Sequence, residues 1–438
     1  MVKACDTELL FLDYRFTVLS FLKVMYMNIA YCSLLLPEEK RLSERTKERL
    51  PGISGHKVTK AEIYGIDSNL DSPVDIFNII NTVNYPKYPQ LVFPDEEWNH
   101  TDISKHVDYH LGYINLFGIK YITQYLSMKR ALNKWVKGQN GTCMICVHNI
   151  FLPAMLAAVH VARKNKEKVK LCLNTGDVPG KYGLQSQFKK NVKQVLIEEL
   201  VNKNVLKLAK QFDCFVFVTK DMAMAFEVED KPYTVVECTY IEPEYAKGKS
   251  ILESEKKTIF YAGSIREEYG IGHLLRSFSL IDSKEYELII AGGGAGEELV
   301  KEYADRDSRI KFIGFITPQE VLQYQLTSHV LVSPRQSDRE YVKYSFPSKS
   351  VDSLATGVPY VAHKLPCDPP EYAGYINYPV GESDEDLRNK LVEICEMPVE
   401  SRRLIGDRGK QFILREKNPT VMTKRIVDMW DKVLKNRI

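Results

Sequence analysis

The segment KYSFPSKSVDSLATGVPYVAHK, from Lys343 to Lys364, holds the residue pair with the clearest chemical potential in this chain. Lys349 and Asp352 are three residues apart, so on a helix they share one face. A loop that leads into such a helix offers free N–H groups and the positive end of the helix dipole, which favour a bound anion. A surface ion pair explains the same spacing, and on spacing alone it is the favoured interpretation.

Local signals around this pair predict a strand, a loop, a helix and a second strand. Pro347 suits the first helical position, because the N–H group that it lacks would have no partner there. Ser345 or Ser348 can cap the helix, and Gly357 supplies a left-handed exit from it. The apolar runs SHVLVSPR and VPYVA on either side are predicted to be strands.

The same alternation of short apolar runs and longer helical patterns extends over most of the chain. Candidate strands are NIAYC, VDIFNII, TCMICV, VKLCLN, CFVFVT and YTVVEC in the first half, and TIFYAG, YELIIAG, IKFIGF, HVLVSP and VPYVAH in the second. Such alternation predicts α/β domains with parallel sheets covered on both faces. A hydrophilic joint, residues 244–257, separates two such domains, at 27–245 and 246–418, and a C-terminal helix follows at 419–438. In such sheets, ligands bind beyond the carboxyl ends of the strands.

Composition excludes several classes of function. The 438 residues carry a net charge of only +3 and no aromatic RNA-binding motif, so we expect no nucleic-acid partner. The nine cysteines are scattered, mostly in apolar runs, which indicates reduced thiols and a cytoplasmic protein. Cys143 and Cys146 form a C-x-x-C without a second pair, so buried thiols are favoured over a zinc or redox site.

Residues 1–26 do not fit the α/β pattern. This stretch is apolar but is interrupted by Asp13, Arg15 and Lys23, which suits neither a signal peptide nor a membrane span. A strand-like run starts afresh at Met27. We interpret residues 1–26 as an accessory extension or as a misassigned start.

The second half of the chain resembles a known family. The segments IFYAGSIREEYGIGHLLRSF, LIIAGGGAGEELV and RIKFIGFITPQEVLQYQLTSHVLVSPR precede the Lys343–Lys364 segment, and together they span about Thr258 to Ala362. In this order they resemble the nucleotide-sugar-binding domain of glycosyltransferase family 4. The first half matches only in its architecture and in its start, MNIAYCSLLLPE. The Lys343–Lys364 segment looks most like bacterial enzymes that build capsular or exported polysaccharides.

The resemblance implies the GT-B fold: two Rossmann-like domains that face each other across a cleft, with C-terminal helices that cross back to the first domain. Residues 27–245 would be the acceptor side, and residues 246–418 would bind the donor. It also implies a retaining hexosyltransferase that moves a sugar from a nucleotide diphosphate sugar to a glycan or lipid-linked glycan acceptor, with no metal and no cofactor.

The family has two glutamates eight residues apart, one for the donor sugar and one for the nucleotide ribose. Here the second falls on Asp352, which still offers a carboxylate to the ribose hydroxyls. The first falls on Tyr344, which is uncharged, and the family's Phe and Gly fall on Phe346 and Pro347. The residues expected at the donor are Asp352, Tyr344, Ser345, Phe346, Ser348, Gly263, Ser264 and Phe315.

The family also holds the diphosphate with an Arg and a Lys in the first loop of this domain. That loop here begins Gly263-Ser264 and lacks both cations, since Arg266 is off register. We expect Arg335 and Lys349 to replace them, because guanidinium and ammonium groups both bind phosphate oxygens. For Arg335 the alternative is an ion pair with Asp338 or Glu340.

In the first domain, His148 and Asp177 each follow a predicted strand, where site residues belong. The resemblance implies that His148 contacts the transferred sugar and that Asp177 lies on the acceptor side. A capping role is the alternative for Asp177. The segment ISGHKVTKAEIYG, with Ser54 and Gly55, would form a Ser/Gly loop and a helix that close on the donor.

Three further patterns have simple explanations. The run AGGGAGEE fails the dinucleotide-binding register and predicts a tight turn at the edge of the sheet. Asp305 and Asp307 have the D-x-D form of metal-binding glycosyltransferases, but exposed charge is favoured, and we expect no catalytic metal. The basic helix Gln185–Lys210 would either rest on anionic lipid, giving peripheral contact at the inner face of the cell membrane, or be solvated.

Two other functions remain open from the sequence. A GT-B partner subunit without catalysis would explain Tyr344 and the missing loop cations. A GT-B epimerase would act on the nucleotide sugar itself.

Overall fold

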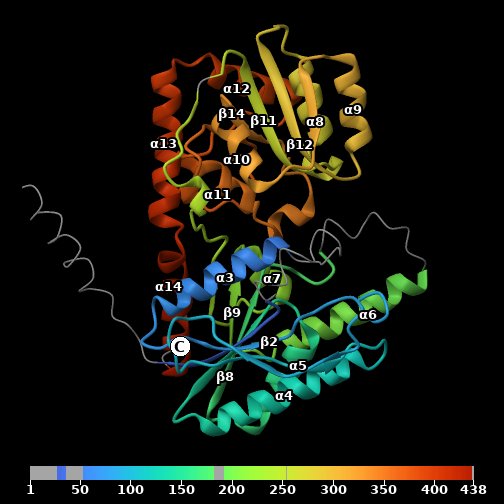
Figure 1. Ribbon diagram of the computed structural model, residues 1–438, viewed down its shortest axis with the longest axis vertical. Helices are drawn as coiled ribbons and strands as arrows, with labels where there is room; N and C mark the ends of the chain where they lie inside the picture. The colour runs from blue at the N-terminus through green and yellow to red at the C-terminus, as the bar shows by residue number, and fades with distance from the viewer. Residues whose placement is uncertain (1–26, 36–52, 182–191, 253, 437–438) are drawn as a thin grey trace, which may run out of the picture.

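The computed structural model describes residues 27–35, 53–181, 192–252 and 254–436, which form two α/β domains stacked along the long axis of the molecule (Figure 1). The predicted extension, residues 1–26, lies outside the described residues. So do residues 185–191 of the predicted basic helix; its remainder forms α6 (Val192–Ala209).

The first domain is built on an eight-stranded sheet in the order β10-β9-β8-β7-β1-β2-β5-β4. All neighbours are parallel except β4 and β5, which are antiparallel. The strands are β1 (Asn28–Ser33), β2 (Asp75–Asn78), β4 (Glu96–Trp98), β5 (Asp108–His110), β7 (Cys143–His148), β8 (Val169–Thr175), β9 (Cys214–Phe217) and β10 (Tyr233–Val235).

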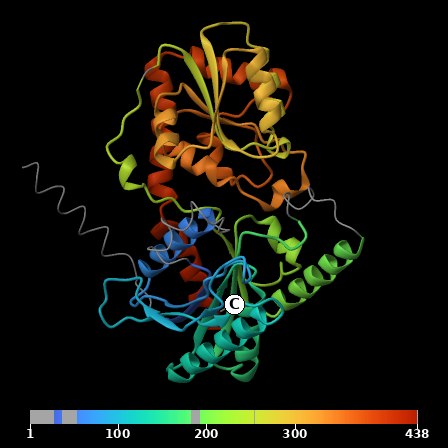
Figure 2. The same cartoon turned by 45° about the vertical axis from the view of Figure 1, so that its right-hand side comes forward.

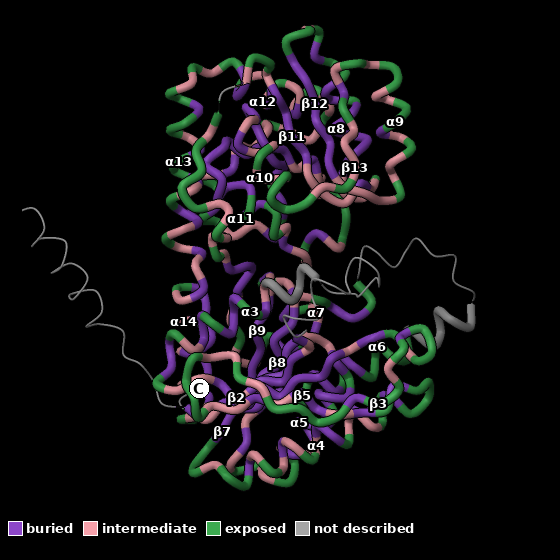
Figure 3. The backbone as a smooth tube through the Cα atoms, viewed as in Figure 1, coloured by how far each residue is buried: buried purple, intermediate pink, exposed green. Residues whose placement is uncertain are grey.

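Helices cover both faces of this sheet, as near-continuous apolar strands require. One apolar core lies under α4 (Lys120–Gly138), α5 (Leu152–Lys164) and α6, and the other under α3 (Ile53–Asp67). Figure 3 shows the resulting pattern, with buried strands inside and exposed helix surfaces outside. A short helix, α7 (Asp221–Phe226), and a two-stranded sheet, β3 (Val92–Phe93) with β6 (Tyr113–Ile114), complete the domain.

The second domain has a five-stranded parallel sheet in the order β13-β12-β11-β14-β15. Its strands are β11 (Lys257–Ser264), β12 (Tyr286–Gly293), β13 (Ile310–Gly314), β14 (Val330–Ser333) and β15 (Tyr360–Ala362). Its helices are α8 (Ile271–Ser279), α9 (Glu297–Arg306), α10 (Pro318–Leu326), α11 (Ser348–Leu354), α12 (Asp384–Glu396) and α13 (Val399–Glu416), with short 3-10 helices η2 (Glu244–Ala246), η3 (Glu267–Tyr269), η4 (Glu340–Tyr344) and η5 (Pro370–Gly374).

The last helix, α14 (Pro419–Leu434), returns to the first domain. It packs against α3 and buries Trp430 in the core beneath that helix. Figures 1 and 2 both show α14 beside the first domain, below α13. The bend at Asn418-Pro419 and the two sheets, parallel except for β4, confirm the predicted architecture.

The two chain connections between the domains are joined by a buried ion pair. Lys417, between α13 and α14, lies with its ammonium 2.6 Å from Glu237 on the segment that leaves β10. Both side chains are 1% exposed. Lys417 also lies 2.9 Å from Glu371, and its carbonyl oxygen accepts a hydrogen bond from the Tyr240 N–H.

The helix after Pro347 differs in one detail from its prediction. Pro347 is the residue before the helix, in an extended conformation, and neither Ser345 nor Ser348 caps it with a side chain. Gly357 has φ = 83°, which confirms the left-handed exit. The strands β3, β4, β5 and β6 were not predicted, since two or three residues carry too little alternation to be recognised.

Candidate functional site

Lys349 extends from the first turn of α11 to the carboxyl end of β11. Its ammonium donates a hydrogen bond to the carbonyl oxygen of Ala262, at 2.9 Å. A methyl group placed on Gly263 would lie 2.5 Å from the same ammonium, so only glycine leaves room for the lysine. Two segments 87 residues apart therefore meet at one point.

The surroundings of Lys349 favour loss of its proton. Its side chain keeps solvent contact, yet partial burial lowers its pKa to about 8. The nearby carboxylate of Asp352 opposes this shift, and the positive charge of Arg335 adds to it. Lys349, Asp352 and Arg335 are thus close enough to interact electrostatically. A bound anion would relieve the repulsion between the two cations.

Arg335 is held by two aromatic rings. Its guanidinium lies 4.7 Å from the ring centre of Tyr269 and 5.4 Å from that of Tyr341, and it donates to the carbonyl oxygen of Ser345 at 3.3 Å. The acids considered as alternative partners pair elsewhere: Asp338 with Arg339, and Glu340 with Lys181. The guanidinium is therefore positioned by stacking.

The loop after β11 packs closely against the loop after β14. Gly270 has φ = 81°, and a Cβ there would lie 2.1 Å from the carbonyl oxygen of Pro334. Within the loop, Arg266 donates to the Ser264 hydroxyl at 3.2 Å. Arg266, which is off register in the sequence, thus bonds within its own loop. The glycine run after β12 also packs here, because a Cβ on Gly292 would lie 1.8 Å from the Gly263 carbonyl oxygen.

Asp352 lies one turn along α11 with an exposed side chain. Tyr240 and Tyr245 lie on the segment that joins the domains, and their own burial and then the negative charge of Asp352 raise their pKa values. Asp352 therefore faces that segment, while Lys349 reaches β11.

Tyr344 lies at the contact between the domains. Its ring packs against the apolar core of the first domain, and the adjacent Lys343 carbonyl oxygen accepts a hydrogen bond from Thr219 at 2.8 Å. Lys181 and Glu340 add an ion pair of 2.5 Å across the same contact. The loops that follow β8 and β14 thus meet, so the carboxyl ends of strands from both sheets converge between the domains.

The other residues expected at the donor occupy different environments. Phe346 is buried and packs against Tyr372 at 5.3 Å between ring centres, so any donor contact from this residue comes from its backbone. Phe315 follows β13 and is 90% exposed. Ser345 is half-buried, and Ser348 is exposed at the start of α11.

In the first domain, His148 ends β7 within a buried hydrogen-bond network. Its Nδ1 lies 2.8 Å from the Tyr31 hydroxyl, and its Nε2 lies 2.9 Å from the Thr59 hydroxyl. The Tyr31 hydroxyl donates to Glu62 at 2.7 Å, and Asn174 also donates to Glu62. Both ring nitrogens of His148 are thus engaged within the protein.

Burial shifts the pKa values of two groups in this network. It lowers the pKa of His148 to about 4 and raises the pKa of Glu62 to about 7. Sequence reasoning missed Tyr31, Thr59 and Glu62. The available signal was Glu62 itself, a carboxylate between the apolar residues Ala61 and Ile63.

The remaining first-domain residues are less enclosed. Asp177 lies in the loop after β8 with an exposed side chain, and its N–H donates to Thr175. The predicted helix is present as α3, and Ser54 and Gly55 lie in its first turn instead of in a preceding loop. No helix of the described residues has the length and apolar character of a membrane span.

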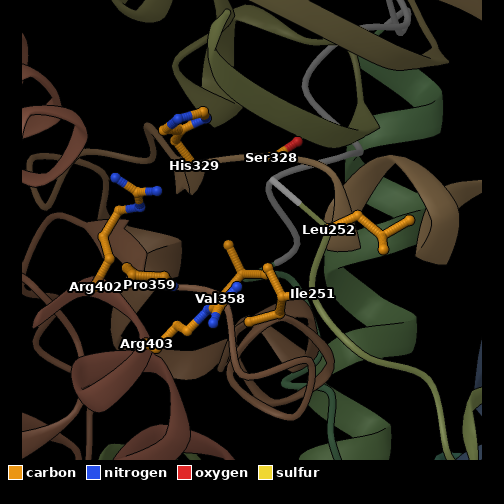
Figure 4. A pocket seen from close by; sticks show the side chains of 8 residues that line it. All are labelled: Ile251, Leu252, Ser328, His329, Val358, Pro359, Arg402 and Arg403. Carbon is orange, nitrogen blue, oxygen red and sulfur yellow. The ribbon is translucent and has the colours of Figure 1, made fainter. Parts of the chain in front are cut away.

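Three further features are a pair of cysteines, a small pocket and a possible metal-binding group. Cys143 and Cys146 are buried and free. A small pocket, drawn in Figure 4, opens at the amino ends of β14 and β15, the opposite sheet edge from Arg335. It is lined by Ile251, Leu252, Ser328, His329, Val358, Pro359, Arg402 and Arg403. One group of the described residues could hold a metal ion, His100, His106 and Asp108, and it lies at the amino edge of the first sheet.

The sequence of the second domain matches a known family. Residues 244–412 match the family model described as Glycosyl transferases group 1. The second domain is a glycosyltransferase domain. The protein is therefore a glycosyltransferase, with a domain from a retaining, metal-independent family. No curated protein sequence matches this chain significantly.

Solved structures show the same two-domain fold, GT-B, over nearly the whole chain. Sucrose-phosphate synthase from Thermosynechococcus elongatus is similar with a TM-score of 0.60 at 14% identity, over 94% of this glycosyltransferase and 100% of that chain. A glycosyltransferase from Rickettsia africae has a TM-score of 0.60 at 12% identity, over 94% and 99%. Anabaena HepE in complex with UDP has a TM-score of 0.56 at 11% identity, over 93% and 100%.

Proposed function

We propose that this glycosyltransferase moves a sugar from a nucleotide diphosphate sugar to a glycan or lipid-linked glycan acceptor in surface polysaccharide synthesis. The observation that carries the proposal is the group formed by Lys349, Arg335 and Gly263 at the carboxyl end of β11. Two cations beside a glycine that admits close backbone approach suit a diphosphate.

Each residue then has a distinct role. When the bond from the anomeric carbon to the diphosphate breaks, negative charge grows on the leaving phosphate oxygen. Lys349 and Arg335 stabilise that charge, and the rings that hold Arg335 in place reduce the reorganisation needed. The Asp352 carboxylate accepts hydrogen bonds from the ribose hydroxyls. Exposed Phe315 offers a flat apolar surface beside the glycine run.

The acceptor side is proposed for the first domain, near Asp177 and the start of α3. His148 then has a positioning role, since its ring nitrogens are hydrogen-bonded to the hydroxyls of Tyr31 and Thr59. We place the enzyme in the cytoplasm, in peripheral contact with the inner face of the membrane, where a lipid-linked acceptor would be found.

One observation favours a second candidate, a partner subunit that binds a nucleotide sugar without turnover. Tyr344 stands where the resemblance puts a donor-sugar carboxylate, and it packs against the first domain instead. An uncharged side chain turned away from the donor would leave binding intact and catalysis weak.

The test uses the full chain with a panel of nucleotide diphosphate sugars, starting with UDP-sugars because Anabaena HepE of the same fold holds UDP. Thermal shifts identify the donor, and turnover is then measured with and without bacterial membrane acceptors. Acceptor-dependent release of the nucleoside diphosphate supports the transferase. Binding without release identifies the partner subunit, and an acceptor-independent change of the sugar identifies an epimerase.

A further inference from the structure

A cluster of two histidines and a carboxylate lies on the first domain, away from the proposed donor site. Asp108 opens strand β5, His106 lies two residues before it, and His100 follows β4. Because β5 is parallel to β2, with Phe77 beside Tyr109, Asp108 lies at the amino edge of the sheet. The proposed donor site lies at the carboxyl edges.

The three side chains converge in a largely buried position that keeps some contact with solvent. His100 Nδ1 lies 2.6 Å from one oxygen of Asp108, and His106 Nε2 lies 3.0 Å from the other. Their side-chain exposures are 12%, 9% and 0% for His100, His106 and Asp108. The ligand atoms all lie within 4.8 Å of one another. In a tetrahedral zinc site, ligand atoms about 2.0–2.2 Å from the ion are separated by roughly 3.3–3.6 Å.

Neighbouring groups hold these side chains in fixed orientations by hydrogen bonds, as is usual around a metal site. His100 Nε2 lies 2.8 Å from an oxygen of Asp67 at the end of α3, which fixes the ring and turns Nδ1 toward Asp108. A carboxylate on the far nitrogen of a ligand histidine is a recurrent feature of zinc sites. The Asp108 oxygens also accept the backbone N–H groups of Ile76 and His100, at 2.9 Å each.

We propose that His100, His106 and Asp108 bind one divalent transition-metal ion, of the zinc class, with water in the fourth position. Two imidazoles and one carboxylate suit zinc and its late first-row neighbours better than magnesium or calcium. The ion takes the place of the ring protons that now lie between the imidazoles and Asp108. Its role is structural: it ties the loop 99–107 and β5 to the end of α3, the helix that carries Thr59 and Glu62 to His148.

The first test is metal binding by the full chain after removal of metal with a chelator. We expect zinc to bind at one ion per chain and to raise the melting temperature. Cobalt(II) at the same site should give visible absorption bands without the near-ultraviolet band of a cobalt–thiolate bond, because no cysteine takes part. A cobalt–thiolate band, or the absence of a saturable site of one ion per chain, would overturn the proposal.

Variants then locate the ion. His106→Gln keeps a side-chain donor for Asp108 but removes a ligand, and should weaken zinc binding by more than about 100-fold. Asp67→Asn should weaken it by about 10–100-fold, the usual effect of losing an outer carboxylate. His160→Gln, whose ring lies beside Tyr125 on another helix, is the matched control and should bind zinc as the wild type does. Equal affinity in wild type, His106→Gln and Asp67→Asn would also contradict the proposal.

Discussion

Lys349 and Gly263 approach each other so closely that a Cβ on Gly263 would lie 2.5 Å from the Lys349 ammonium. Gly263→Ala should therefore displace the lysine from the end of β11 and reduce donor turnover at least about tenfold. The added Cβ would also lie 2.8 Å from the Tyr261 hydroxyl, so the melting temperature should fall as well. Gly374→Ala is the control, since nothing lies within 4 Å of its Cβ. Equal turnover in both variants would show that the position of Lys349 is unimportant.

The lowered pKa of Lys349 predicts a pH dependence of donor binding. With a pKa of about 8, the lysine is charged below that pH and neutral above it. A neutral amine does not attract a diphosphate, so the affinity for UDP should be steady up to about pH 7 and fall by up to about tenfold per pH unit above 8. Lys349→Arg keeps its charge and should remove this dependence. Calorimetric titration from pH 6.5 to 9.5 checks it, and a flat wild-type profile would contradict it.

The network around His148 contains two opposing titrations. The folded pKa of His148, about 4, is below its ordinary 6.5, so stability from this group is lost as the pH falls from about 6.5 to 4. The folded pKa of Glu62, about 7, is above its ordinary 4.5, so its contribution is lost as the pH rises from about 4.5 to 7. Between pH 4.5 and 6.5 the two residues therefore change the unfolding free energy with pH in opposite directions.

Glu62→Gln should reveal the pH dependence of the unfolding free energy that comes from His148 alone. The amide still accepts hydrogen bonds from Tyr31 and Asn174 but does not titrate. Compared with wild type, the variant's unfolding free energy should fall more steeply on acidification, by up to about 1.4 kcal/mol per pH unit. Urea unfolding at pH 4.5, 5.5 and 6.5 measures this difference. Parallel curves would show that Glu62 is already ionised in the folded protein.

The buried pair of Lys417 and Glu237 makes a prediction about the junction of the domains. Lys417→Met leaves Glu237 unpaired in the interior and should lower the unfolding free energy by about 3–5 kcal/mol. Lys417→Met combined with Glu237→Gln should recover part of that loss. Lys424→Met breaks an exposed pair with Asp428 and should change it by about 0–1 kcal/mol. Similar losses for Lys417→Met and Lys424→Met would contradict the account.

Much of this architecture is predictable because its signals are local. Gly357 and the apolar strands on either side identify α11 with its neighbours, and the same patterns place His148 at the end of a strand. Contacts between distant elements leave no such signal. The sequence does not show that Glu62 from α3 meets His148, or that Arg335 lies between Tyr269 and Tyr341. Tyr344 could not be placed against the first domain, because its environment depends on how the two domains meet.

The central claim is that Lys349 and Arg335 stabilise charge on the leaving diphosphate, while Asp352 binds the ribose. Steady-state kinetics with the identified donor separates these roles. Lys349→Ala and Arg335→Ala should each lower kcat by about 10²-fold or more. Asp352→Asn should mainly raise the donor KM, by a loss of about 1.5–3 kcal/mol in binding, with a smaller effect on kcat. If Lys349→Ala and Asp352→Asn both leave turnover intact and only lower the melting temperature slightly, the two residues are a surface ion pair and the proposed site is wrong.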